Sequence, residues 1–245
     1  MKVVFTMGGI THYLSPLLDN VVRKGVDVVM VIPSVKDNQT IGKGVKLVNN
    51  EALYQVRYSE IKQGWYGKTI LTDLKTILNE EKPDIVVLGW PYFLQYFFDR
   101  QLRLLIKENN IKLIIREIPF QVPPFGQLSY FKENPVYDEN MILQSRGMSF
   151  FIRALCTMYI RKFVYKHADA TINYASCAYD ILPSYGVNKD KIFVTYNTPN
   201  TESLIRLREK VLSAPPLLEK KQRILHIGRL SLIHISEPTR PISIS

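Results

Sequence analysis

Short apolar segments alternate with amphipathic ones from the start of the chain, and this alternation restricts the fold more than any other feature. Residues 2–7 (KVVFTM) and 26–32 (VDVVMVI) are short apolar runs with the length of buried strands. Between them, Ser15-Pro16 is typical of a helix start and Gly25 of a helix end. Strand, helix and strand in this order predict a βαβ unit of a parallel sheet.

The same alternation continues to about residue 212. Further strands are predicted at 84–89, 111–117, 170–174 and 191–196, with shorter ones around 45–48 and 54–58. Further helices are predicted at 69–80, 93–108, 149–167, 176–185 and 202–212, and residues 126–148 are expected to form a loop with a short helix. The pattern predicts a Rossmann-like α/β fold, a parallel sheet with helices on both faces. Ligands of such sheets bind beyond the carboxyl ends of the strands.

Composition is that of a globular protein, with 46% hydrophobic and 22% charged residues. The formal net charge of +10 favours anionic partners, which include a nucleotide diphosphate, an acidic lipid surface and nucleic acid. Charge alone does not choose among them.

The beginning of the chain leads directly into the first predicted strand, without a signal peptide, and no apolar run has the length of a membrane span. We therefore expect a cytoplasmic protein. Cys156 and Cys177 share no metal-ligand spacing and lie in apolar stretches, so both are predicted to be buried structural thiols.

Candidate binding residues follow the predicted strands. After the first strand, Gly8 and Gly9 allow a ligand to approach the backbone, and His12 lies in the same loop. After the strand at 84–89, Trp90 and Tyr92 have rings that stack on a sugar face or pack at the edge of the domain. For each of these residues, a purely structural role remains the alternative.

Three further strand ends carry polar side chains. Arg116 and Glu117 end the strand at 111–117, where they grip an acceptor or form a salt bridge with each other. Tyr174 and Asn197 follow the next two strands. All of these residues are predicted to meet at one edge of the sheet.

Several motifs of other enzyme classes are missing from the sequence. It contains no G-x-G-x-x-G dinucleotide fingerprint, no D-x-D, no H-x-x-x-H and no G-x-S-x-G. Gly67-Lys68-Thr69 looks like the end of a phosphate loop, but no apolar strand precedes it. We therefore expect neither a metal nor a bound cofactor.

The predicted helix at 149–167 carries aromatic and basic residues together, such as Phe150, Tyr159, Arg153 and Lys166. One interpretation is a helix that covers the sheet and exposes a solvated basic face. The other is peripheral contact with an anionic membrane.

The segment after residue 212 divides into three parts. Residues 214–222 have the composition of a linker, and 223–230 (RILHIGRL) predict the first strand and turn of a second domain. Residues from Leu230 to Arg240 match the translation of a transposase adapter used in preparing sequencing libraries. We therefore expect domains at 1–213 and 223–230, and a non-native tail at 231–245.

Three of these features together resemble glycosyltransferase family 4 of the GT-B fold. They are the strand–Gly8-Gly9–helix opening, the segment 167–201 (HADATINYASCAYDILPSYGVNKDKIFVTYNTPNT), and 223–230, where Gly228 and Arg229 stand in the G-R-L turn. The resemblance covers nearly all of residues 1–230, and its order and spacing are more specific than any one motif.

The resemblance implies an amino-terminal, acceptor-side domain of a two-domain transferase. A parent enzyme of this kind transfers sugar from a nucleotide-sugar to a lipid-linked or polysaccharide acceptor, without a metal and with no role for nucleic acid. By resemblance, Gly9 approaches the donor phosphates, His12 faces the cleft and Arg229 contacts the diphosphate. The lysine and the glutamate pair of the family's second domain are missing here, so the chain as written is expected to be inactive.

Two other functions fit the same sequence. A GT-B-like sugar-nucleotide epimerase would carry its carboxylates in the second domain. A stand-alone α/β ligand-binding module would bind a small anion or sugar without turnover.

Overall fold

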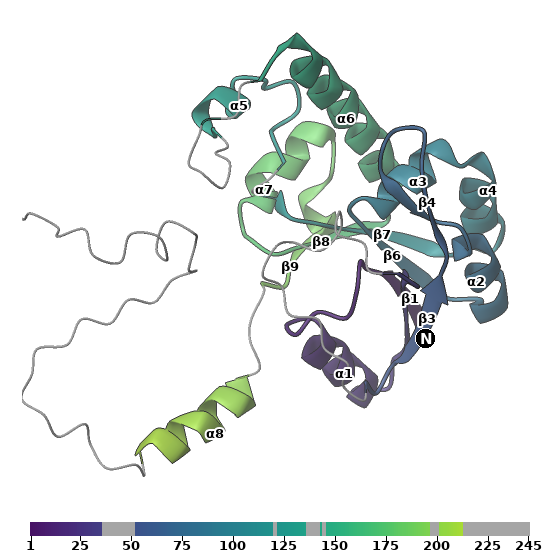
Figure 1. Cartoon of the computed structure of the whole chain (residues 1–245), viewed down its shortest axis with the longest axis vertical. Coiled ribbons are helices and arrows are strands. Elements are labelled where there is room, and N and C mark those ends of the chain that lie inside the picture. Colours follow the sequence, from purple (N-terminus) through teal and green to yellow (C-terminus); the bar gives the residue numbers. More distant parts are fainter. Residues whose placement is uncertain (36–51, 120–121, 136–142, 144–145, 197–200, 213–245) are drawn as a thin grey trace, which may run out of the picture.

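The computed structural model describes residues 1–35, 52–119, 122–135, 143, 146–196 and 201–212. Within them lies a seven-stranded parallel sheet in the order β3-β2-β1-β6-β7-β8-β9 (Figure 1). Its strands are β1 (Lys2–Thr6), β2 (Asp27–Pro33), β3 (Gln55–Ser59), β6 (Ile85–Gly89), β7 (Lys112–Glu117), β8 (Ala170–Asn173) and β9 (Ile192–Val194). The predicted Rossmann-like α/β fold is confirmed. The strand order reverses between β1 and β6, so this is the switch point of the sheet.

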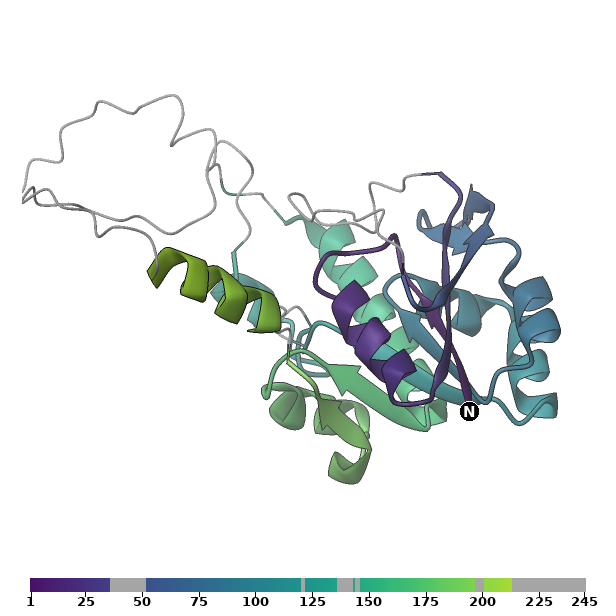
Figure 2. The same ribbon diagram turned by 90° about the horizontal axis from the view of Figure 1, so that it is seen from below.

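Helices cover both faces of this sheet. The helices of the described residues are α1 (Ser15–Arg23), α2 (Leu74–Glu81), α3 (Tyr92–Phe98), α4 (Arg100–Glu108), α5 (Tyr130–Glu133), α6 (Met148–His167), α7 (Ala178–Ile181) and α8 (Thr201–Leu212), with 3-10 turns η2 (Leu182–Tyr185) and η3 (Lys189–Lys191). Of these, α8 lies away from the sheet, and its described side chains are exposed (Figures 1 and 2). Because side chains alternate along a strand, Val29 and Val31 of β2 join the core under α2, α3, α4 and α6. Val28 and Met30 join a smaller core under α1, on the other face (Figures 1 and 2).

Residues 61–71 form an antiparallel hairpin of β4 (Ile61–Gln63) and β5 (Thr69–Leu71), which we call the flap. The predicted helix at 69–80 is therefore wrong in its first turn, and α2 begins only at Leu74. A buried glutamine on α3 holds the flap: the Leu71 N–H donates to Gln95 Oε1 (3.1 Å), and Gln95 Nε2 donates to the Leu71 carbonyl (2.9 Å). The amide thus completes the backbone hydrogen bonds of β5 as a neighbouring strand would.

The predicted single helix at 93–108 is two helices, α3 and α4, that meet at Asp99. This residue adopts an extended backbone (φ −98°, ψ 100°), and its Oδ1 accepts hydrogen bonds from the N–H groups of Gln101 (2.9 Å) and Leu102 (3.1 Å). Arg103 Nη1 in turn donates to the Tyr96 carbonyl (2.9 Å) at the end of α3. The break is a capped helix start, which the apolar periodicity does not reveal.

Asp99→Ala is expected to lower the free energy of unfolding by about 0.5–2 kcal/mol, the usual effect of losing a helix cap. Burial raises the pKa of Asp99, but hydrogen bonds from Lys75 (2.9 Å) and the Leu102 N–H outweigh it, so the pKa is lowered. A lowered carboxyl pKa stabilises the fold above the ordinary pKa and loses that contribution as pH falls through the folded pKa. Urea unfolding should therefore separate the variant from the wild type near neutral pH and bring them together in acid. Asp180→Ala, at an exposed aspartate of α7, serves as the control. A gap that stays constant with pH would contradict the assignment.

Two further predictions are corrected by the structure, and four fall on residues that it does not describe. The helix predicted at 176–185 is the short α7 followed by η2. Cys156 is exposed on α6 and Cys177 is half-buried, so the prediction of two buried thiols is wrong. The strand predicted at 45–48, the linker at 214–222, the domain start at 223–230 and the tail at 231–245 lie outside the described residues.

Candidate functional site

The carboxyl-terminal edge of the sheet brings the predicted site residues together. Gly8, Gly9 and His12 follow β1, and Trp90 follows β6, on the two sides of the switch point. Arg116 and Glu117 end the neighbouring β7, and Tyr174 follows β8. The remaining predicted residues, Asn197, Gly228 and Arg229, lie outside the described residues.

Arg116 and Glu117 do not form the salt bridge with each other that the sequence allows. As neighbours on one strand they point to opposite faces of the sheet. Arg116 contacts Met7 on the α1 side, whereas Glu117 contacts α6 on the other. The end of β7 therefore contributes to two separate sets of contacts.

Glu117 holds a buried charged cluster with two residues of α6. Arg161 donates to both carboxylate oxygens, from Nε (3.2 Å) and from Nη2 (3.1 Å), and the Tyr165 hydroxyl donates to Oε2 (2.7 Å). The side chains of Arg161 and Glu117 are only 11% and 5% exposed. Such a paired geometry fixes the guanidinium plane against the end of the strand.

Burial and the neighbouring carboxylate have opposite effects on the pKa of Arg161. Burial by itself lowers the pKa of Arg161, but the Glu117 carboxylate outweighs it, so the pKa is raised and the guanidinium stays charged. Burial raises the pKa of Tyr165 well above its ordinary value, so this hydroxyl stays protonated and donates. Within the described residues, Nη1 of Arg161 has no hydrogen-bond partner, which leaves it donors for a ligand.

The predicted aromatic pair after β6 is divided. The Trp90 ring is 38% exposed and lies 5.0 Å from the Arg161 guanidinium carbon, a cation–π contact. Tyr92 is 1% exposed in the core, and its hydroxyl donates to the Met7 carbonyl (3.4 Å). Trp90 is therefore the ring that a ligand can reach. Tyr92 is a core residue that contacts the backbone just after β1, at the switch point.

An open cavity of about 1150 Å³ lies beside this cluster, between the flap, α3 and α6. Its aromatic wall contains Trp65, Tyr66, Trp90 and Phe98, together with Phe131 and Phe150. Its charged wall contains Lys68, Arg153, Arg161 and Glu117. The one carboxylate among these lining residues is already paired with Arg161, so the cavity as a whole attracts anions.

The tip of the flap supplies part of this cavity, although none of its residues was predicted as a site residue. Trp65 is 83% exposed, and Tyr66 stacks on Phe98 of α3 with ring centroids 4.5 Å apart. Burial raises the pKa of Tyr66 to about 12, and its hydroxyl has no hydrogen-bond partner in the described part of the chain. The two consecutive aromatic residues before Gly67 were the sequence feature that could have indicated this part of the cavity, because exposed aromatic rings in a turn often mark a binding surface.

On the α1 side of the sheet edge, aromatic and cationic groups also meet. His12 is exposed, and its ring is T-shaped to Tyr13 at 5.3 Å. Tyr13 is hydrogen-bonded to Tyr174, and the Arg116 guanidinium lies 4.4 Å from the centre of the Tyr174 ring. His12 therefore lies exposed in the loop after β1, and its role in facing a cleft remains a prediction.

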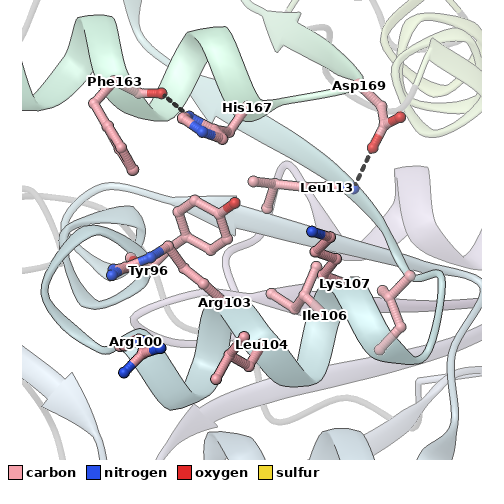
Figure 3. Close-up of a pocket in the computed structure, with 11 residues that line it drawn as sticks. Tyr96, Arg100, Arg103, Leu104, Ile106, Lys107, Leu113, Phe163, His167 and Asp169 are labelled. Carbon is pink, nitrogen blue, oxygen red and sulfur yellow. Dashed lines mark hydrogen bonds between the residues drawn. The ribbon is translucent and has the colours of Figure 1, made fainter.

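A smaller pocket of about 460 Å³ lies at the opposite end of the strands, near the start of β7 (Figure 3). Three of its polar side chains make contacts within the protein. Arg103 donates to the carbonyls of Tyr96 and Phe97, and the His167 ring contacts the Phe163 carbonyl at 2.7 Å. Asp169 accepts the Leu113 N–H. The contacts of Arg103, His167 and Asp169 are therefore structural.

Helix α6 does not separate its residues into an apolar and a basic face. Its buried residues are Met158, Val164 and Tyr165, while Ile152 and Tyr159 are exposed. Peripheral membrane contact therefore remains a prediction. In the described residues, no helix combines the length and the apolar character of a membrane span, and no three His, Cys, Asp or Glu side chains gather as metal ligands.

Comparison with known proteins gives distant structural matches only. No protein-family model matches the chain, and no curated protein matches it. The chain is similar to UDP-N-acetylglucosamine 2-epimerase from Rickettsia bellii, with 15% identity over 87% of this chain and 49% of that one and a TM-score of 0.45. A second UDP-N-acetylglucosamine 2-epimerase gives 16% identity over 80% and 48%, again with a TM-score of 0.45. The dTDP-glucose 4,6-dehydratase from Bacillus anthracis gives 12% identity over 71% and 54%, with a TM-score of 0.38.

The chain thus spans about half the length of the structures it matches. Two of these structures are UDP-N-acetylglucosamine 2-epimerases, and a sugar-nucleotide epimerase is one of the two alternative functions that the sequence allows.

Proposed function

We propose that this chain is the acceptor-side domain of a two-domain nucleotide-sugar enzyme, and that its cavity binds the lipid-linked sugar acceptor of a glycosyltransferase. The observation that supports this is the composition of the cavity wall. Exposed indole rings at Trp65 and Trp90 suit the faces of sugars and the apolar part of a lipid. Lys68, Arg153 and Arg161 suit the phosphate that links them.

The nucleotide-sugar donor is expected at the switch point, where the loop with Gly8, Gly9 and His12 faces the end of β6. Most contacts to it would come from a second domain, as the resemblance of residues 223–230 implies. The transfer needs no metal under this proposal, and the cytoplasm is its expected compartment.

The epimerase alternative makes a different demand on the cavity. An epimerase acts on the sugar nucleotide itself and has no second substrate to place in 1150 Å³ of aromatic and cationic wall. The cavity therefore favours transfer, while the choice between the two activities depends on whether an acceptor binds.

Intrinsic fluorescence of the whole chain tests this choice, because the sequence has two tryptophans and both line the cavity. A soluble short-chain alkyl-diphospho-sugar should change the emission saturably, and Trp90→Ala should weaken its binding about tenfold or more, as loss of a central aromatic contact does. Phe193→Ala, at an exposed aromatic residue of β9 outside the cavity, should leave binding unchanged.

Two results would overturn the proposal. Saturable binding of a nucleotide-sugar with none of the alkyl-diphospho-sugar would favour the epimerase. Equal binding of the alkyl-diphospho-sugar by wild type and Trp90→Ala would remove the cavity from the site.

A further inference from the structure

Arg116 is a buried cation at the ligand-binding edge of the sheet, and its partners are weak ones. Its side chain is 9% exposed at the end of β7, on the α1 side. Nη1 donates to the Met7 sulfur (3.3 Å), and the guanidinium carbon lies 4.4 Å from the centre of the Tyr174 ring. The Met7 thioether is a weak hydrogen-bond acceptor. The Tyr174 ring attracts the guanidinium charge but accepts no hydrogen bond from the N–H groups that point along the guanidinium plane.

Other arginines with restricted exposure are paired differently. Arg161 binds Glu117 through two nitrogens, and Arg57 binds the carboxylates of Glu80 and Glu81. Among the described residues, Arg116 has no carboxylate within ion-pair distance. A charge removed from water without a counter-charge is costly, so a buried arginine of this kind favours an anion that arrives from outside.

The surroundings of Arg116 supply further donors at the same edge. Met7, which it contacts, leads directly into Gly8 and Gly9. The Thr11 hydroxyl in the same loop is buried without a hydrogen-bond partner in the described part of the chain. Burial raises the pKa of the Tyr174 hydroxyl, so Tyr174 stays protonated and the cluster carries no negative charge of its own against an anion.

We propose that Arg116 is the receptor for a phosphate or diphosphate group of a substrate, bound where β1, β7 and β8 end. The planar fork of a guanidinium matches two phosphate oxygens, and the glycines let those oxygens approach the backbone of the loop after β1. This site is separate from the cavity, which lies across β7 on the α6 side. The assignment to a substrate rests on the proposed function, whereas anion binding at Arg116 can be measured without it.

Calorimetric titration of the whole chain with inorganic pyrophosphate at low salt tests the proposal. Arg116→Gln should weaken binding at least tenfold, and Arg116→Lys should weaken it less because it keeps the charge and loses the fork. Arg100→Gln, which removes the same charge from an exposed position in the pocket of Figure 3, should bind as the wild type does. Equal binding by wild type and Arg116→Gln, or equal weakening by both glutamine variants, would overturn the proposal.

UDP and geranyl diphosphate distinguish the two sources of such a group. If UDP binds more tightly than pyrophosphate and depends on Arg116, the nucleotide-sugar supplies the phosphates. If geranyl diphosphate shows that behaviour instead, the acceptor supplies them, and its phosphates lie at Arg116 instead of in the cavity where the proposed function puts them. Both outcomes support an anion receptor at Arg116.

A labelling experiment keeps the test decisive if Arg116→Gln does not fold. Phenylglyoxal modifies arginines at rates that follow their accessibility, so Arg116, 9% exposed at the ligand-binding edge, should react slowly but measurably, and mass spectrometry of the wild-type chain reports each position. Pyrophosphate should slow modification of Arg116 at least several-fold without protecting Arg100, and equal rates at Arg116 with and without pyrophosphate would overturn the proposal. Protection at Arg116 without any alkyl-diphospho-sugar binding in the cavity would leave this inference standing and refute the proposed function.

Discussion

Glu117→Gln is expected to lower the free energy of unfolding by about 3–5 kcal/mol, because it leaves the Arg161 charge buried without a counter-charge. The glutamine still accepts the hydrogen bond of Tyr165, so the loss reports on the ion pair. The effect is large because Arg161 is only 11% exposed, so solvent compensates poorly for the lost carboxylate. Urea unfolding at neutral pH measures it, and Glu108→Gln, at an exposed position of α4, should stay within about 0.5 kcal/mol of the wild type.

A double variant distinguishes the contribution of the ion pair to stability from the contribution of side-chain packing at the same two positions. Glu117→Leu with Arg161→Met removes both charges and keeps apolar volume at both positions, so it should recover most of the stability that Glu117→Gln loses. A double variant as unstable as the single one would show that the cluster acts through packing. Unchanged stability of Glu117→Gln would show that Arg161 finds another partner.

Phe93→Ala is expected to lower the free energy of unfolding by about 3–5 kcal/mol, the usual range for truncating a buried phenylalanine. Phe93 is fully buried on α3, its ring meets the Trp90 ring at 5.4 Å, and the Arg161 guanidinium carbon lies 5.9 Å from it. The substitution therefore also removes the support of the cavity wall. Thermal and urea unfolding measure the first effect, and a shift of Trp90 emission in a Trp65→Phe background measures the second.

Phe193→Ala is the matched control for this truncation, because Phe193 is exposed on the edge strand β9. It should change stability by no more than about 0.5 kcal/mol. If Phe93→Ala costs no more than this control, α3 does not anchor the cavity as described. If Phe93→Ala destabilises the fold but leaves Trp90 emission unchanged, the Trp90 ring is held in the cavity wall by α6 alone.

The sequence predicted the main sheet well because a parallel strand buried on both faces is an uninterrupted apolar run. Residues 26–32 show this most clearly, since the structure buries Val28 to Ile32 without exception. The flap was missed for the opposite reason. The apolar residues Ile70 and Leu74 also have helical spacing, and the contact that fixes Leu71 in a strand comes from Gln95, 24 residues later.

Part of the site was predictable for a geometric reason. Parallel strands deliver their following residues to one edge, which is why Gly9, Trp90 and Glu117 all lie at the carboxyl-terminal edge of the sheet. Their partners were not predictable, because Arg161 and Tyr165 come from a helix 44 and 48 residues beyond Glu117. Spacing of four residues on one helix face was the only local sign that these two act together.

The opposite orientations of Arg116 and Glu117 have a consequence for how enzymes on this scaffold diversify. Adjacent positions of one strand face different chambers. Under the proposed function, substitutions around Glu117 on α6 would alter which acceptor binds, while the proposed phosphate site at Arg116 would stay intact. Proteins with this fold would thus be able to change acceptors through substitutions on the α6 side of the sheet alone. Insertion or deletion of a single residue within β7 would exchange the two chambers at once, and selection should therefore hold the length of this strand more strictly than its composition.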